Sequence, residues 1–200
     1  MTKIVLASGN PGKLKEFGAL LADSGFNVVP QGQLGIEDVE ETGLTFVENA
    51  LLKARHASRI SGLPALADDS GLCVDHLGGA PGLYSARYSG NHGDAAANNA
   101  KLLHALEGVP QEQRGAFFIC VLVLLRHAED PAPLIAEARW HGRILGEGRG
   151  TGGFGYNPVF LPDGYAQSVA EMDDALKNRL SHRGQALVLL RERLRELHAG

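Results

Sequence analysis

The order of apolar and polar residues predicts strands that alternate with helices in the first part of the chain. Short apolar runs at residues 3–7 and 26–30 are typical of buried strands, and Leu14, Phe17 and Leu21 recur at helical spacing between them, with Gly25 as the stop. A second helix is predicted after Thr45, because Thr45 and Glu48 form a capping-box pattern. Apolar residues then follow on one face of that helix: Val47, Ala50, Leu51, Ala54 and Ala57.

The middle of the chain predicts two short strands around a polar turn. The first covers Pro64–Ala67 and ends in the sequence Asp-Asp-Ser-Gly at residues 68–71, and the second covers Leu72–Leu77. A glycine- and tyrosine-rich loop at Gly78–Gly90 leads to a helix over Asp94–Leu106.

The second half predicts a central strand, a hairpin partner and a long last helix. Ala116–Arg126 is the most apolar stretch, and Leu134–Trp140 alternates weakly, as a hairpin partner would. Leucines at 187, 190, 194 and 197 form the buried stripe of the last helix. The fold class is therefore α/β, a mixed sheet with helices on its faces.

Composition and charge narrow the class of protein. The 200 residues suffice for one domain with a full core, or for two small lobes that share a sheet. A net charge of −4 gives no electrostatic hold on nucleic acid, although local positive charge still allows a small anionic ligand. No apolar run approaches the ~18 residues of a membrane helix, and no signal-peptide layout opens the chain. With Cys73 and Cys120 in apolar runs, we expect reduced thiols and a cytoplasmic protein.

A loop between the first strand and the first helix is a candidate phosphate site. A helix N-terminus offers unpaired N–H groups and a favourable dipole to an anion, and glycine lets the backbone approach it closely. Lys13 adds a positive charge to this loop, but the residue pattern is not a Walker A motif. An ordinary turn with Asn10 as helix cap accounts for the local pattern equally well. The loop consists of Ser8, Gly9, Asn10, Pro11, Gly12 and Lys13.

Acidic residues at the end of a strand are candidate magnesium ligands. Adjacent strand residues point to opposite faces, so only one of Asp68 and Asp69 faces a given site. Magnesium takes one or two carboxylates together with phosphate oxygens and waters. Ordinary turn chemistry explains the sequence Asp-Asp-Ser-Gly as well. Glu40 or Glu41 is a candidate second acid, unless both belong to a solvated acidic loop.

A glycine-rich run in the second half imitates a dinucleotide fingerprint. Residues 150–155 match G-x-G-x-x-G, but a strand-like stretch follows where that motif requires a helix, which excludes NAD. A flexible loop with Phe154 and Tyr156 suits stacking on a flat base better.

Three basic residues cluster before or at the start of the last helix: Lys177, His182 and Arg183. With Ser181 as helix cap, two of them oppose the helix dipole, which indicates that they serve an anion or a hydrogen-bond acceptor. A basic surface patch is the alternative. The histidines show no metal-ligand spacing, and no arrangement for nucleophilic catalysis is present.

Taken together, the sequence resembles the inosine/xanthosine triphosphate pyrophosphatase family, the ITPase-like or RdgB-like enzymes. Six stretches carry the resemblance from the first strand to the last helix, in the order of the family. They are SGNPGK (8–13), EETG with TFVENALLKA (40–54), ADDSGL (67–72), GGAPGLYSARYSG (78–90), GTGGFGYNPVF (150–160) and SHRGQA (181–186).

The resemblance implies an α/β fold with a long curved mixed sheet and two lobes around an active-site cleft, in a single domain over residues 1–200. It implies a homodimer that uses Mg²⁺ to hydrolyse ITP, dITP and XTP to monophosphate and pyrophosphate, which excludes deaminated purines from DNA and RNA. The net charge and the short apolar runs lead us to expect neither a nucleic-acid nor a membrane partner.

The resemblance also implies roles for individual residues. Ser8–Lys13 would bind the phosphates with help from Lys53, and Asp69 would be general base and magnesium ligand, with Glu40 as second ligand. The residues implied to contact the nucleotide are Ser70, Phe154, Gly155, Tyr156, Asn157, Lys177, His182 and Arg183. Asn157 is a departure, because the family has FGYD where this chain has FGYN.

Water would attack the α-phosphorus, and donors from His182 and Arg183 would suit the O6 acceptor of hypoxanthine or xanthine. Two rival classes stay open at this point. One is a nucleotide-binding sensor without catalysis, and the other is a Maf-type pyrophosphatase that acts on pyrimidine or modified nucleotides.

Overall fold

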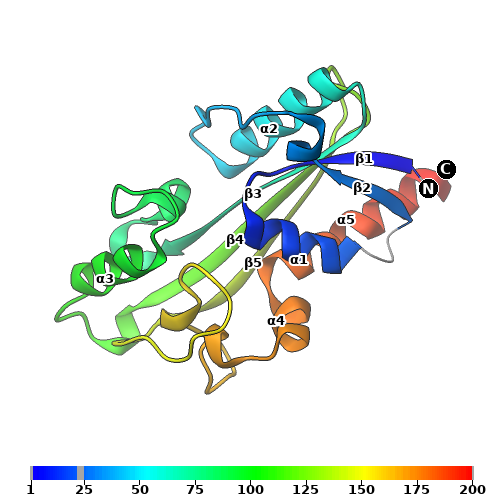
Figure 1. Cartoon of the computed structure of the whole chain (residues 1–200). Helices are drawn as coiled ribbons and strands as arrows, with labels where there is room; N and C mark the ends of the chain where they lie inside the picture. Colours follow the sequence, from blue (N-terminus) through cyan, green and yellow to red (C-terminus); the bar gives the residue numbers. More distant parts are fainter. Residues whose placement is uncertain (1, 22–24, 200) are drawn as a thin grey trace. The chain divides into compact units, whose positions relative to one another are not determined.

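A computed structural model describes residues 2–21 and 25–199 and contains one six-stranded sheet (Figure 1). The strand order is β2-β1-β3-β4-β5-β6. β1 pairs in parallel with β2 and β3, whereas β5 and β6 are antiparallel, so the predicted mixed α/β sheet is confirmed. The strands are β1 (Thr2–Ala7), β2 (Phe26–Pro30), β3 (Ala65–Val74), β4 (Gly115–Leu125), β5 (Leu134–Ile144) and β6 (Phe160–Pro162).

Five α-helices flank these strands in the described part of the chain. They are α1 (Pro11–Leu21), α2 (Phe46–Ser61), α3 (Ala95–Ala105), α4 (Asp174–Leu180) and α5 (His182–Ala199). Thr45 is the N-cap of α2, as predicted, because its Oγ1 accepts from the Glu48 N–H. The Glu48 carboxylate reaches back and accepts from the Leu44 N–H and the Thr45 hydroxyl. No described helix combines the length and apolar character that a membrane crossing needs.

The chain divides into two compact units. The first comprises Met1–Asp69, Cys120–Ala138 and Arg183–Gly200, and the second comprises Ser70–Ile119 and Arg139–His182. Each of β3, β4 and β5 begins in one unit and ends in the other. The predicted single domain over residues 1–200 remains a prediction.

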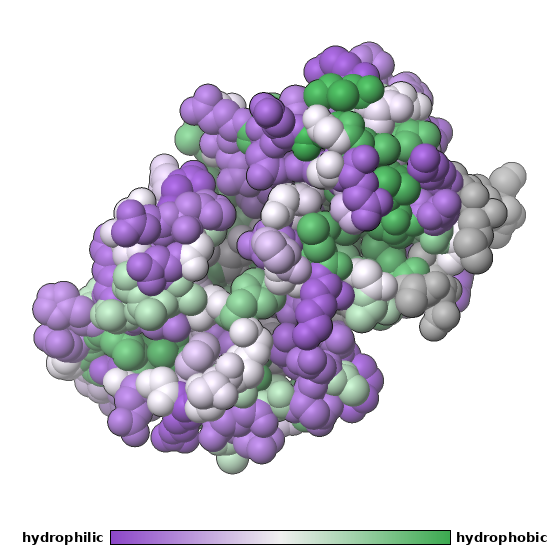
Figure 2. Space-filling view, viewed as in Figure 1, coloured by the Kyte–Doolittle hydropathy of each residue, from purple (hydrophilic) through white to green (hydrophobic). Residues whose placement is uncertain are grey.

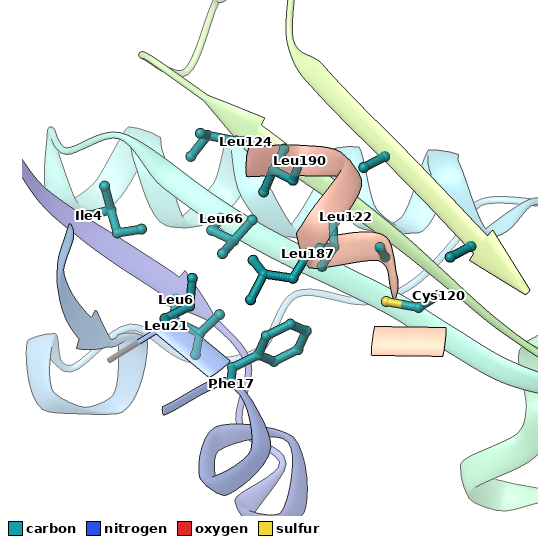
Figure 3. Packing of buried hydrophobic residues seen from close by; sticks show 13 residues of the cluster. Ile4, Leu6, Phe17, Leu21, Leu66, Cys120, Leu122, Leu124, Leu187 and Leu190 are labelled. Atoms are coloured by element: carbon teal, nitrogen blue, oxygen red, sulfur yellow. The ribbon is translucent and has the colours of Figure 1, made fainter. Parts of the chain in front are cut away.

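The core of the first unit lies where α1 and α5 pack on the strands (Figure 3). Phe17 of α1 is fully buried, and the Leu187 and Leu190 side chains of α5 complete the layer. Helix α2 lies on the other side of these strands (Figure 1). Its buried Ala50, Ala54 and Ala57 belong to the predicted apolar face. The side chain of Leu197, predicted in the α5 stripe, lies outside the described residues.

The core of the second unit is more aromatic. Phe160 lies 4.6 Å from Phe118 and 5.9 Å from Trp140, measured between ring centroids. Tyr156 is buried in the same cluster together with residues of β3, α3 and β4. Hydrophilic residues cover most of the face drawn in Figure 2, and apolar residues show there in separate groups.

The prediction of a turn at residues 68–71 was wrong. β3 runs without a break from Ala65 to Val74, and nine of its ten residues are buried. Polar residues continue the strand because Asp68 and Asp69 find charged partners inside the fold. β5 extends to Ile144, beyond the predicted Trp140, and α4 is a separate helix that the sequence pattern did not predict.

Candidate active site

The predicted phosphate loop lies between a strand and a helix, as expected. Asn10 Oδ1 accepts from the Lys13 N–H at 3.1 Å, and Ser8 Oγ accepts from the Asn10 N–H at 3.3 Å. Asn10 therefore caps α1, as the alternative interpretation proposed. This cap uses one N–H group of the first turn, so it does not exclude an anion there.

Gly9 makes room for a carboxylate that the sequence did not connect with this loop. A Cβ atom at Gly9 would lie 2.6 Å from Asp38 Oδ2, so a larger residue would displace that side chain. Gln31 Nε2 holds the other carboxylate oxygen of Asp38 at 2.5 Å. The acidic segment before α2 is thus fastened against the loop.

Asp68 anchors the lysine of the loop. Its Oδ2 lies 2.8 Å from Lys13 Nζ and 4.0 Å from Arg183 Nε, and the side chain is 1% exposed. Burial would raise the pKa of Asp68, but the charges of Lys13, Lys53 and Arg183 outweigh it and hold that pKa well below its usual range. Arg183 Nη1 also donates to Glu16 Oε2 at 2.5 Å. Glu16, three residues after Lys13 on α1, is a member of this network that sequence analysis missed.

Asp69 is in a different electrostatic situation. Its Oδ1 accepts from Lys53 Nζ at 3.0 Å, and Lys53 also donates to Glu41 Oε1 at 2.7 Å. Burial raises the pKa of Asp69, Lys53 and Lys13 lower it, Glu41 raises it again, and the net direction is upward. Asp69 Oδ2 is buried and has no hydrogen-bond partner among the described residues.

The two adjacent aspartates serve opposite faces of β3. Asp68 meets side chains of α1 and α5, whereas Asp69 meets Lys53 of α2. This confirms the prediction that only one carboxylate faces a given site, and it excludes the alternative of an ordinary turn. The two carboxylates therefore differ in their electrostatics, because the pKa of Asp68 is lowered and the pKa of Asp69 is raised.

The donor set around Asp69 fits a hard cation. Magnesium prefers carboxylate oxygens and keeps positions for phosphate and water, and Asp69 Oδ2 is a buried oxygen that nothing described satisfies. Lys53 forms ion pairs with both Glu41 and Asp69, whereas Glu40 is exposed to solvent. Within residues 2–21 and 25–199, no group of three or more His, Cys, Asp and Glu residues could hold a metal.

The glycine-rich loop of the second unit is not a dinucleotide motif. A 3-10 turn at Asn157–Val159 and then β6 follow it, so the helix that a dinucleotide fingerprint requires does not follow this loop, as predicted. A Cβ atom at Gly150 or Gly152 would lie 2.8 or 2.7 Å from the Ala170 carbonyl oxygen, which explains why glycines pack here.

The aromatic residues of this loop have different surroundings. Tyr156 is 4% exposed and its hydroxyl donates to the Ser85 carbonyl at 2.7 Å, so its ring belongs to the core. Phe154 is half-buried. The Asn157 amide nitrogen lies directly against Gly153, where any Cβ atom would collide with it.

The three basic residues near the last helix are not a surface patch. Lys177 and His182 are each 6% exposed, and Arg183 is 7% exposed, so the alternative of a solvated patch is excluded. The His182 ring stacks on Phe118 with centroids 4.9 Å apart. Lys177 belongs to α4, where its Nζ lies 3.8 Å from Asp174. Ser70 directly follows Asp69 and is half-buried.

The fold and these charged residues define an α/β protein with lysines and carboxylates gathered around β3. The Ham1 family profile matches residues 4–193, and the chain belongs to the Ham1 family. A "dITP/XTP pyrophosphatase" of Xanthomonas campestris is 65% identical over 197 residues, covering 98% of this chain and 99% of the relative. The protein of that name from Escherichia coli O157:H7 is 56% identical over 195 residues, with 98% and 99% covered. A solved HAM1 protein of Coxiella burnetii has a TM-score of 0.90 at 48% identity, covering 98% of this chain and 100% of the other.

Proposed function

We propose that this protein hydrolyses deaminated purine nucleoside triphosphates, namely dITP, XTP and ITP, to the monophosphate and pyrophosphate. By this reaction it would exclude such nucleotides from DNA and RNA. The observation that carries the proposal is the buried Asp69 carboxylate, which has one oxygen held by Lys53 and one without a partner among the described residues. The names of the relatives from Xanthomonas campestris and Escherichia coli support the choice of substrate.

The proposed cofactor is Mg²⁺, with Asp69 as ligand and Glu40 as the second ligand implied by the family. The position of Glu41 beside Lys53 makes it an alternative second ligand. When bound, the ion would supply positive charge to the phosphates and to the leaving pyrophosphate.

In the proposed reaction, Asp69 takes a proton from a water that attacks the α-phosphorus in line with pyrophosphate. General base catalysis of this kind is worth about 10²–10⁴-fold. Lys13 and Lys53, together with the N–H groups of the Ser8–Lys13 loop, would offset the phosphate charge. Lys53 stays protonated, because the surrounding carboxylates raise its pKa despite burial.

We assign the contacts with the purine base of the nucleotide to Ser70, the Phe154–Asn157 segment, Lys177, His182 and Arg183. Donors from His182 and Arg183 would meet the O6 acceptor, whereas the amino group of adenine would face them donor to donor. Such unpaired donors reject a wrong substrate by roughly 10⁴–10⁵-fold. The family resemblance implies a homodimer. The reduced cysteines expected from the sequence favour a location in the cytoplasm.

A pyrophosphate-release assay with ITP, dITP, XTP, GTP and ATP tests this function, with and without Mg²⁺. We expect turnover of the first three in Mg²⁺, and loss of turnover with retained nucleotide binding in Asp69→Asn. Binding without pyrophosphate release by the unaltered enzyme would favour a sensor. Preference for pyrimidine triphosphates in the same panel would favour a Maf-type enzyme.

A further inference from the structure

Two consecutive asparagines of α3 hold two loops of the second unit. Asn98 is 4% exposed, its Oδ1 accepts from the Ser89 N–H at 2.7 Å, and its Nδ2 reaches the Ser85 carbonyl at 3.4 Å. Asn99 Nδ2 donates to the Gly155 carbonyl at 3.0 Å. Asn98 thus holds the loop before α3, and Asn99 holds the glycine-rich loop that we assign to contacts with the purine base of the nucleotide.

Ser85 joins this arrangement to β3 and to the same glycine-rich loop. Its hydroxyl accepts from the Leu72 N–H at 2.9 Å, and its carbonyl accepts from the Tyr156 hydroxyl at 2.7 Å. The adjacent residues Gly155 and Tyr156 are therefore each held by one hydrogen bond, Gly155 by Asn99 and Tyr156 by Ser85. Gly155 has a φ of +63° and no side chain to pack, so hydrogen bonds to its backbone and to that of its neighbours hold this conformation.

We propose that Asn99 is a positioning residue for substrate recognition, which presets the Phe154–Asn157 segment for the base. This inference rests on the proposed function. Since Asn99 acts through the Gly155 carbonyl, its loss should weaken nucleotide binding and leave the chemical step unchanged. A preset loop loses less conformational freedom on binding, so its loosening raises KM.

The second amide atom of Asn99 makes a clean test possible. Asn99 Oδ1 is buried and has no hydrogen-bond partner among the described residues. Replacing an asparagine by leucine therefore removes one hydrogen bond and also one unsatisfied acceptor, so the fold should persist. Asn99→Asp puts a carboxylate against the Gly155 carbonyl and should have the larger effect.

The experiment compares Asn99→Leu and Asn99→Asp with a control on the same helix, His104→Gln, whose side chain is 80% exposed. KM and kcat are measured with dITP, together with inhibition by dIMP and by pyrophosphate. We expect Asn99→Leu to raise KM and the dIMP inhibition constant by roughly three- to tenfold, the usual effect of one hydrogen bond. The values of kcat and of pyrophosphate inhibition should not change, and the control should match the unaltered enzyme.

Three outcomes would overturn the inference. One is an unchanged KM in a folded Asn99→Leu variant, and another is an equal loss of pyrophosphate affinity, which would indicate a general structural role. The third is unaltered enzyme that releases no pyrophosphate from dITP, which removes the proposed function and this inference with it. The first two leave the proposed function standing.

Discussion

Asp68 and Asp69 are adjacent in the chain, yet only the replacement of Asp68 by asparagine should lower the stability of the fold. Asp68 is ionised and held by Lys13 and Arg183, and its pKa is lowered in the folded state. A lowered pKa means that its charge stabilises the fold at any pH above the pKa of the unfolded chain. At pH 7 this contribution is therefore fully present, and Asp68→Asn removes it.

The magnitude follows from the burial of the partners. Removing one member of a buried ion pair costs about 3–5 kcal/mol. Lys13 is 14% exposed and can reach water, and Arg183 keeps its bond to Glu16, so the low end applies. A loss of about 3 kcal/mol in a domain of this size lowers Tm by roughly 6–12 °C.

Thermal and urea unfolding at pH 7 measure this change, with Asp69→Asn as the matched variant. The pKa of Asp69 is raised, so its charge destabilises the fold at neutral pH, and the amide should leave Tm unchanged or higher. Equal losses of Tm in both variants, or a loss only in Asp69→Asn, would refute the assignment of Asp68 as the ionised anchor and of Asp69 as the general base.

Three further predictions follow from other contacts. Lys53→Met leaves the two carboxylates it bridges without their cation, so kcat/KM for dITP should fall by about 10²-fold or more in steady-state assays. Asn157→Asp should change kcat/KM by less than about threefold, since the amide fills space against Gly153; a large gain or loss would show that charge matters there. Asp130→Ala should lower Tm at pH 7, because hydrogen bonds from Arg126 hold the pKa of Asp130 below its usual range. That stabilising contribution disappears as the pH falls through the folded-state pKa, so the Tm difference should shrink in acid, and a constant difference would contradict this reasoning.

Much of the fold follows from local patterns in the sequence. The spacing of Leu14, Phe17 and Leu21 and the Thr45–Glu48 capping box predicted α1 and α2, since both signals act within one or two helical turns. The apolar run after Gly115 predicted the central strand β4. These elements need no distant partner to be recognised.

The errors concern residues whose conformation depends on distant partners. Asp68 and Asp69 have the local chemistry of a turn, yet they continue a buried strand because Lys13 and Lys53 neutralise them from two helices. The contacts of Glu16 with Arg183 and of Asp38 with Gly9 join segments that the sequence pattern treats separately. The basic character of Arg183 was visible, but its burial was not.

The most direct test of the central claim, hydrolysis at the α-phosphorus by a water that Asp69 activates, is isotope labelling. The enzyme is incubated with dITP and Mg²⁺ in water enriched in ¹⁸O, and the products are analysed by mass spectrometry. We expect the label in dIMP, none in pyrophosphate, and no labelled product from Asp69→Asn. Label in pyrophosphate, or labelled dIMP at the normal rate from Asp69→Asn, would contradict the account.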